Sequence, residues 1–234
     1  GAEFNPHTII SDAEMQDYQS MSRGDISSFL REKNSFLSTY RATDEDGKKR
    51  RAADIIYRAA RESKINPKYL LVKLQKEQSL ITTQKPNEKQ LDWATGYGVC
   101  DSCSFSDPKV LRHKGFATQV HSAAGIIRWY YDNYPTQGFV KRANVTYTID
   151  GQKVTPTSNA TAFLYTYTPH IHGNKNFAML WDKWFGFVYP ENSLVKTADD
   201  STVYLLQGNK KRAFKNFSSL VTRFDSKTIF TIPE

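Results

Sequence analysis

Residues 65–83 read INPKYLLVKLQKEQSLITT, and this stretch predicts the helix around which the rest of the chain packs. Asn66 is a typical N-cap residue, and Pro67 suits the first helical position because its missing N–H has no partner there. Leucines recur at helical spacing on one face, and Glu77 lies in the same stripe. A glutamate is rarely buried without a specific role, so Glu77 is the first candidate functional residue.

Two interpretations of Glu77 are open at this point. If leucines surround its carboxyl group, burial raises the pKa and keeps the acid protonated near neutral pH, as a proton donor requires. Alternatively, Glu77 pairs with a basic residue, or it lies at the edge of the stripe beside Lys73 or Lys76. A perturbed carboxylate is only statistical evidence of catalysis, so the pattern does not choose between them.

The composition is that of a globular protein and favours an anionic partner. The chain has 234 residues, 39% hydrophobic and 24% charged, and no apolar run approaches the roughly 18 residues of a membrane span. The net charge of +8 fits nucleic acid, a membrane surface or an acidic wall polymer. The basic runs at 48–51 and 210–212 are short, which is more typical of solvated faces than of a nucleic-acid site. We therefore expect no nucleic-acid partner.

Cys100 and Cys103 stand in a C-x-x-C spacing within residues 96–108, GYGVCDSCSFSDP. A zinc site needs four ligands, and the chain has no second pair of cysteines. A redox pair usually opens a helix, whereas the serines and Pro108 predict a loop. We expect a disulfide, which is typical of exported proteins, and two free thiols stay the alternative.

Hydrophobic periodicity and turn residues predict the domain organisation. Residues 1–189 form a mainly helical domain with a small β-hairpin at Asp150-Gly151; 1–21 are an irregular lead-in, and 1–4 read as a cloning scar, so a removed leader is not excluded. Residues 190–201 read as a linker, and 202–234 as a small ββαβ unit. The expected helices cover approximately 22–33, 49–63, 67–78, 113–134, 159–167 and 174–185.

Other polar residues add candidates of lower specificity. His170 and His172 lie in one loop, but no third ligand is near in sequence, so we expect no metal and no cofactor. Asp101 is either a second carboxylate or a turn residue. The chain has no phosphate-binding loop, no G-x-S-x-G and no H-E-x-x-H, which excludes the common nucleotide-binding, serine-hydrolase and zinc-protease motifs but not a carboxylate mechanism.

Residues 65–79 resemble the first motif of lytic transglycosylases and goose-type lysozymes, a helix that begins Ile-x-Pro and ends in a catalytic Glu followed by Ser. Residues 96–99 (GYGV) stand where that superfamily has a Gly-Leu-Met-Gln box, and Asp101 matches an Asp that often follows it. Residues 162–167 meet the later Ala-Tyr-Asn-x-Gly motif only loosely. The chain departs from the pattern in the inserted Gln78 and in the box, which keeps only its first Gly. The resemblance covers roughly residues 49–185.

The resemblance implies a lysozyme-like fold and a peptidoglycan-cleaving glycosidase, a lytic transglycosylase or muramidase acting on the MurNAc-GlcNAc β-1,4 bond. Glu77 would be the general acid and base, with Asp101 as the candidate second carboxylate. The candidates for binding the glycan are Gln78, Ser79, Tyr97, Tyr165, Tyr167, His170 and Asn174. The alternative is a non-catalytic wall-binding or adhesion module. Either function predicts a secreted or cell-surface protein whose partner is peptidoglycan or an anionic wall polymer.

Overall fold

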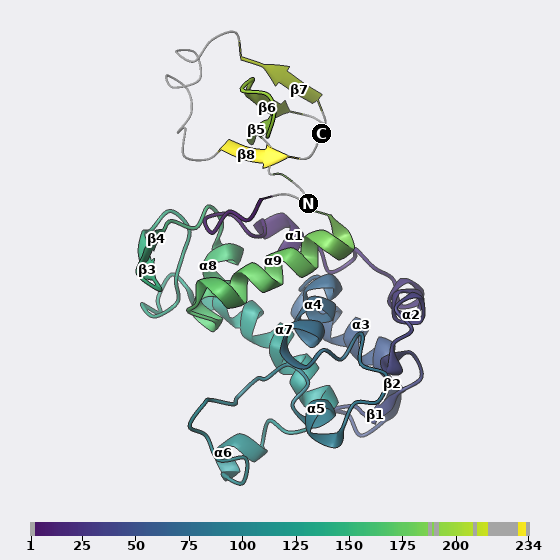
Figure 1. Cartoon of the computed structure of the whole chain (residues 1–234). Coiled ribbons are helices and arrows are strands. Elements are labelled where there is room, and N and C mark those ends of the chain that lie inside the picture. Colours follow the sequence, from purple (N-terminus) through teal and green to yellow (C-terminus); the bar gives the residue numbers. More distant parts are fainter. Residues whose placement is uncertain (1–2, 187–188, 190–191, 208–209, 215–228, 233–234) are drawn as a thin grey trace.

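The computed structural model describes residues 3–186, 189, 192–207, 210–214 and 229–232 (Figure 1). Helices form the larger part of the molecule, and a small sheet from the C-terminal residues lies at the end where α9 finishes. The helices are α1 Asp12–Met15, α2 Arg23–Glu32, a 3-10 turn Phe36–Ser38, α3 Ala52–Ser63, α4 Pro67–Gln78, α5 Glu88–Asp92, α6 Pro108–Leu111, α7 Phe116–Asn133, α8 Asn159–Tyr167 and α9 Ile171–Phe185. The strands are β1 Arg41–Thr43, β2 Lys49–Arg51, β3 Tyr147–Ile149, β4 Gln152–Val154, β5 Leu194–Thr197, β6 Tyr204–Gln207, β7 Lys210–Ala213 and β8 Ile229–Ile232.

Helix α4 lies in the middle of the helical part, as predicted from residues 65–83. The side chain of Asn66 caps its first turn by accepting a hydrogen bond from the Lys68 N–H at 2.9 Å, and Pro67 is the first helical residue. Ser79 ends the helix in the left-handed conformation, with φ of 54°. The helix packs against α9 and α3, so most of its side chains are buried and only its last turn reaches the surface.

Helix α7 is the longest helix of the described residues and packs most extensively on α3. Its buried residues include Val120, Ala124 and Ile127, which belong to the same hydrophobic core as the inner faces of α3 and α4. No helix of the described residues is both long and apolar enough to cross a membrane.

The predicted fold class, mainly α and lysozyme-like with one hairpin, is wrong in its β content. The structure has three small sheets in the described residues, and the first of them, β1–β2, was not predicted. Residues 49–51 were assigned to the following helix, which begins at Ala52 instead. Four of the six residues in these strands are arginine or lysine and only Thr43 is β-branched, so neither propensity nor alternation indicated them. The second hairpin, β3–β4, turns at Asp150-Gly151 as predicted, with both residues at positive φ.

The C-terminal residues form a four-stranded sheet in the order β7-β6-β5-β8, in which β5 and β8 are parallel and the other pairs antiparallel. Strand β5 lies within residues 190–201, which were expected to be a linker. The unit expected at 202–234 therefore has an additional strand, and the sheet corrects the predicted ββαβ order. The helix expected around 217–224 lies outside the described residues.

Candidate functional site

Glu77 lies in the last turn of α4, where two lysines of the same helix hold its carboxylate. Lys73 and Lys76 donate to the same oxygen, Oε1, at 3.0 and 2.8 Å. The side chain of Lys73 is 4% exposed and that of Glu77 is 25% exposed, so the pair is largely removed from water. The negative end of a helix dipole disfavours a carboxylate, and the two ammonium groups offset this effect.

The charges around Glu77 keep it ionised. Burial favours the neutral acid and would raise its pKa, but the charges and hydrogen bonds of Lys73 and Lys76 outweigh burial and hold the pKa of Glu77 below its ordinary value. Burial also lowers the pKa of Lys73 to about 8, although Glu77 opposes this shift. The expectation of a carboxylic acid protonated near neutral pH is therefore wrong, and the alternative of a basic partner is confirmed.

The second carboxylate oxygen of Glu77, Oε2, faces a glycine. Gly96 has φ of +69°, and a Cβ atom at this position would lie 3.3 Å from Oε2. Both lysines bind the other oxygen, Oε1. Within the described residues, no hydrogen bond reaches Oε2. Glycine thus permits the turn and its close approach to the carboxylate, and Oε2 keeps its capacity to accept a hydrogen bond.

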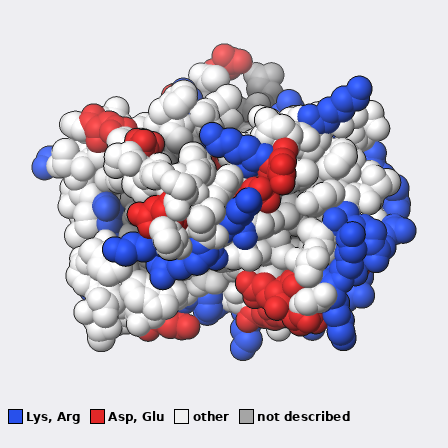
Figure 2. Space-filling model, turned by 90° about the horizontal axis from the view of Figure 1, so that it is seen from below, with Lys and Arg blue, Asp and Glu red and all other residues white. Residues whose placement is uncertain are grey.

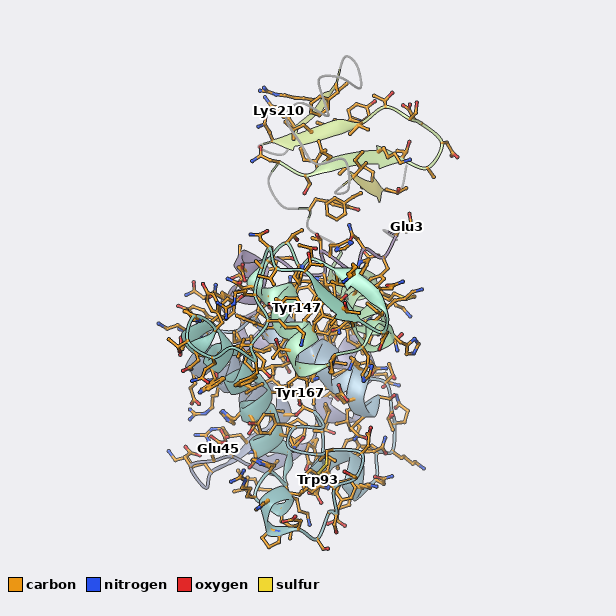
Figure 3. All side chains as sticks on the ribbon, turned by 90° about the vertical axis from the view of Figure 1, so that its left-hand side faces the viewer. Glu3, Glu45, Trp93, Tyr147, Tyr167 and Lys210 are labelled. Carbon is orange, nitrogen blue, oxygen red and sulfur yellow. A yellow bond between two sulfur atoms is a disulfide. The ribbon has the colours of Figure 1, made fainter. Side chains whose placement is uncertain are left out.

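Tyr167 lies near this carboxylate. The centroid of its ring is 3.9 Å from Nζ of Lys73, which binds Glu77, and Figure 3 labels Tyr167 on the helical part. Burial raises the pKa of Tyr167, and Glu77, Tyr130 and Tyr97 raise it further, so these groups are close in space. None of the hydroxyls of Tyr97, Tyr130 and Tyr167 hydrogen bonds to another residue in the part of the chain that the structure describes. They are therefore available as donors and acceptors.

Gln119 of α7 fixes the turn that presents Gly96 and Tyr97. Its side chain is fully buried. Its Oε1 accepts from the N–H groups of Thr95 and Tyr97 at 3.2 and 3.0 Å, and its Nε2 donates to the carbonyls of Tyr97 and His113 at 2.9 and 2.7 Å. Gln119 therefore orders both ends of the loop from residue 95 to residue 113.

A groove of about 470 Å³ continues from Tyr97 and Tyr130 along the surface of α7. Its outer part is aromatic: Trp129 and Phe139 are 38% and 63% exposed, and their rings stack at 5.9 Å with an interplanar angle of 21°. Gly125 lies in the same groove, and a Cβ atom at this position would touch nothing within 4 Å. Core packing therefore does not require a glycine here. Glycine destabilises a helix by roughly 0.5–1 kcal/mol relative to alanine. Its effect at this position is to leave space in the groove.

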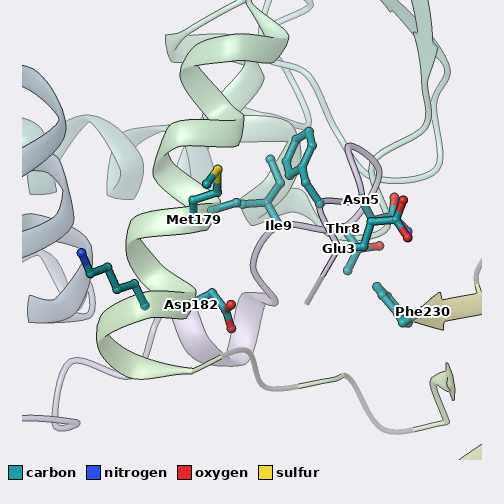
Figure 4. Close-up of a pocket in the computed structure, with 10 residues that line it drawn as sticks. Glu3, Asn5, Thr8, Ile9, Met179, Asp182 and Phe230 are labelled. Carbon is teal, nitrogen blue, oxygen red and sulfur yellow. The ribbon is translucent and has the colours of Figure 1, made fainter. Parts of the chain in front are cut away.

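A second pocket, of about 450 Å³, lies away from this site (Figure 4). The N-terminal segment, α9 and β8 form it, with Ile9, Met179 and Phe230 as apolar lining. It contains none of the candidate residues. The groove beside Glu77 is therefore the candidate site.

Comparison with known proteins places the chain in a family. The family described as "LasA, N-terminal domain" matches residues 8–197, which is most of the chain. The chain belongs to this family. The searches of curated proteins and of solved structures found no match. The matching family is not that of the lytic transglycosylases or lysozymes, so the resemblance noted in residues 65–79 stays a prediction.

Two of the predicted binding residues lie at the site of this LasA N-terminal domain, Tyr97 and Tyr167. Four others have structural contacts. Gln78 donates to the carbonyl of Trp93 at 3.2 Å, and Tyr165 donates to the carbonyl of Pro6 at 2.8 Å. Asn174 donates to the carbonyls of Thr168 and His170, and His170 lies 3.0 Å from Asp150. Ser79 is exposed at the end of α4.

The C-x-x-C segment of the LasA N-terminal domain is a disulfide, as predicted. Cys100 and Cys103 are joined within an exposed turn. Asp101 is exposed between them, and no hydrogen bond or ion pair of the described residues connects it to Glu77. This placement fits the turn residue rather than the second carboxylate.

Sequence reasoning missed the residues that shape the groove. The sequence places Trp129 near the end of the helix expected at 113–134 without indicating a role for it, and Phe139, Gly125 and Gln119 were not singled out. A buried glutamine in a helix and a glycine in the same helix are weak signals alone. Their roles appear only when the loop from residue 95 to residue 113 is placed against α7.

Proposed function

We propose that this domain binds the glycan strands of bacterial peptidoglycan in the groove lined by Tyr97, Trp129 and Phe139. Membership of the LasA N-terminal family supports a role at the cell wall. The observation that carries the proposal is an aromatic groove whose lining residue Tyr97 follows Gly96, the glycine that faces the free oxygen of the Glu77 carboxylate. A glycan presents both hydroxyl groups and flat apolar ring faces, so it fits a site with both features.

The polar end of the groove suits a ligand rich in hydroxyl and amide groups. Oε2 of Glu77 accepts hydrogen bonds, and the hydroxyls of Tyr97, Tyr130 and Tyr167 donate or accept them. A hydrogen bond to an ionised acceptor is stronger than one between neutral groups. The lysines on Oε1 hold the carboxylate in one position, so little freedom is lost when a ligand binds.

The aromatic end suits the face of a sugar ring. Trp129 and Phe139 present stacked rings to solvent, and the absence of a side chain at Gly125 leaves room between them and Tyr97. Ligand sites typically combine apolar and aromatic lining with a few polar groups, in volumes of roughly 300–1,000 Å³. The groove has both the composition and the size of such a site.

Binding is better supported than cleavage because Glu77 has no proton to donate at neutral pH. A glycosidase needs a protonated acid at the glycosidic oxygen. Lys73 and Lys76 lower the pKa of Glu77 and so oppose that role. Cleavage of the MurNAc-GlcNAc bond, by a lytic transglycosylase or a muramidase, is the second candidate, and the uncovered Oε2 favours it because a proton-transferring oxygen must face the ligand.

Trp129→Ala is expected to weaken binding to purified peptidoglycan about tenfold, the effect of losing roughly 1.4 kcal/mol of stacking. Trp129 is 38% exposed, so its truncation also removes some buried area, and thermal unfolding checks that the variant is folded at the binding temperature. Phe105→Ala is the matched control, since Phe105 is also 38% exposed but lies in another surface hollow. Co-sedimentation with the polymer measures the dissociation constants. Equal losses for both variants would contradict the proposal.

The same samples distinguish binding from cleavage. Mass spectrometry of the supernatant detects any released muropeptides, and an anhydro or reducing end identifies the reaction. We expect no released products from the parent protein. Release that Glu77→Gln abolishes, but that the exposed control Glu32→Gln does not, would replace the binding proposal by the glycosidase.

We further propose that the protein acts outside the cytoplasm, at the cell surface or after secretion. The disulfide supports this location, because disulfides persist in oxidising compartments. The family supports it as well. Peptidoglycan is present there, so location and ligand agree.

A further inference from the structure

The hairpin β1–β2 has a cationic outer face. Arg41 and Arg51 are directly opposite each other in the antiparallel register, and Lys49 lies on the same face. All three are exposed. Like charges directly opposite each other destabilise a strand pair, so this arrangement weakens the hairpin. Figure 2 shows lysine and arginine side chains gathered at the right-hand edge, where β1 and β2 lie in Figure 1.

No acidic residue neutralises this face. Among the described residues, no carboxylate lies within 4.0 Å of a charged nitrogen of Arg41, Lys49 or Arg51. The three acidic residues of the same hairpin are engaged elsewhere: Asp44 is buried, Glu45 lies 3.9 Å from Nδ1 of His121, and Asp46 pairs with Arg50. Arg41 donates one hydrogen bond to the carbonyl of Lys49 at 3.3 Å, which leaves its other N–H groups and the charges of Lys49 and Arg51 for an external anion.

A buried ion network on the other side keeps the hairpin rigid. The carboxylate of Asp44 is 1% exposed and receives Arg50 of β2 at 2.9 Å, Arg58 of α3 at 3.1 Å and His121 of α7 at 2.8 Å. Hydrogen bonds to Asp44 keep its carboxyl ionised despite burial, so its pKa is lowered. The network connects the hairpin to two core helices and presents the outer cations in a fixed arrangement.

We propose that Arg41, Lys49 and Arg51 form a binding surface for a linear phosphodiester polymer of the cell wall. Cross-strand neighbours lie about 5 Å apart, so the three cations match a chain of closely spaced charges better than a single carboxylate. Guanidinium groups bind phosphate through paired hydrogen bonds. That the polymer belongs to the cell wall rests on the proposed function. That the three cations bind a chain of phosphates rests only on their charge and spacing.

The test compares walls that retain their polyol-phosphate polymer with walls from which hydrofluoric acid has removed it. The parent should bind the retained walls more tightly, with an affinity that falls as salt rises. Arg41→Gln/Arg51→Gln should weaken this binding about tenfold and reduce the slope of log K against log salt by about 0.7 for each lost phosphate contact. The control is Lys210→Gln/Arg212→Gln, which removes two exposed cations from β7. It should change neither the affinity for the retained walls nor the slope against salt.

Stability gives an independent readout. Removing Arg41 and Arg51 relieves their repulsion, so the variant should unfold about 1–2 °C higher than the parent while binding more weakly. The stripped walls should bind parent and variant equally through the glycan groove, which separates failure of this proposal from failure of the proposed function. Unchanged binding of the variant to retained walls, or tighter parent binding to duplex DNA than to the polymer, would overturn the proposal.

Discussion

Gln119→Leu is expected to lower the free energy of unfolding by about 4 kcal/mol. Leucine fills a similar volume but leaves the N–H groups of Thr95 and Tyr97 and the carbonyls of Tyr97 and His113 without their partner. A buried polar group without a hydrogen bond costs about 1–3 kcal/mol. Urea unfolding followed by tryptophan fluorescence measures the change.

The exposed glutamine Gln84 provides the matched control. It also donates to a backbone carbonyl, that of Asn34 at 2.7 Å, but both groups are exposed. Gln84→Leu should therefore change stability by less than about 0.5 kcal/mol. Hydrogen exchange at Tyr97 should accelerate in Gln119→Leu and not in the control. Similar stability losses for the two variants would show that Gln119 does not order the loop.

Glu77→Gln is expected to destabilise the fold by about 2 kcal/mol. Glutamine retains an oxygen for hydrogen bonding but leaves the ammonium groups of Lys73 and Lys76 without a counter-charge. An unpaired charge at a buried position is strongly unfavourable, and Lys73 is almost completely buried. In the double variant Glu77→Gln/Lys73→Met the unpaired buried charge is absent, so more than half of the lost stability should return. Additive losses in this double-mutant cycle would contradict a coupled pair.

The same interaction predicts a pH dependence. The folded-state pKa of Glu77 lies below its ordinary value of 4.5, so its stabilising effect is present above 4.5 and is lost as the pH falls through the folded-state pKa. The stability difference between parent and Glu77→Gln should thus be largest near neutral pH and should shrink as the pH falls below 4.5. A difference that grows in acid would mean that the folded-state pKa is raised instead.

The sequence predicted the six longer helices because their signals are local, and it missed the short helices α1, α5 and α6. Asn66 and Pro67 mark the beginning of α4, and the apolar spacing behind them requires no knowledge of the rest of the chain. The hairpin β3–β4 follows from Asp150-Gly151 for the same reason. The hairpin β1–β2 depends instead on the distant contacts of Asp44 with α3 and α7, which no local pattern contains.

The candidate site was predicted in position but not in its electrostatics. Glu77 lies in the stripe as expected, yet the same helical spacing places Lys73 one turn away with its nitrogen on the carboxylate. Periodicity does not indicate whether a long side chain points inward or extends to solvent. The choice between a neutral acid and an ion pair therefore required the structure. The stacking of Trp129 on Phe139 likewise depends on how the chain runs between α7 and residue 139, which no local pattern indicates.

The central claim is that Glu77 is ionised and binds a ligand as an acceptor rather than donating a proton. A pH titration of the Glu77 side-chain carboxyl carbon by ¹³C NMR tests it most directly, with Glu77→Gln to assign the signal. We predict a titration midpoint below the ordinary glutamate value of 4.5. A midpoint above this value would contradict the account and restore Glu77 as a candidate general acid.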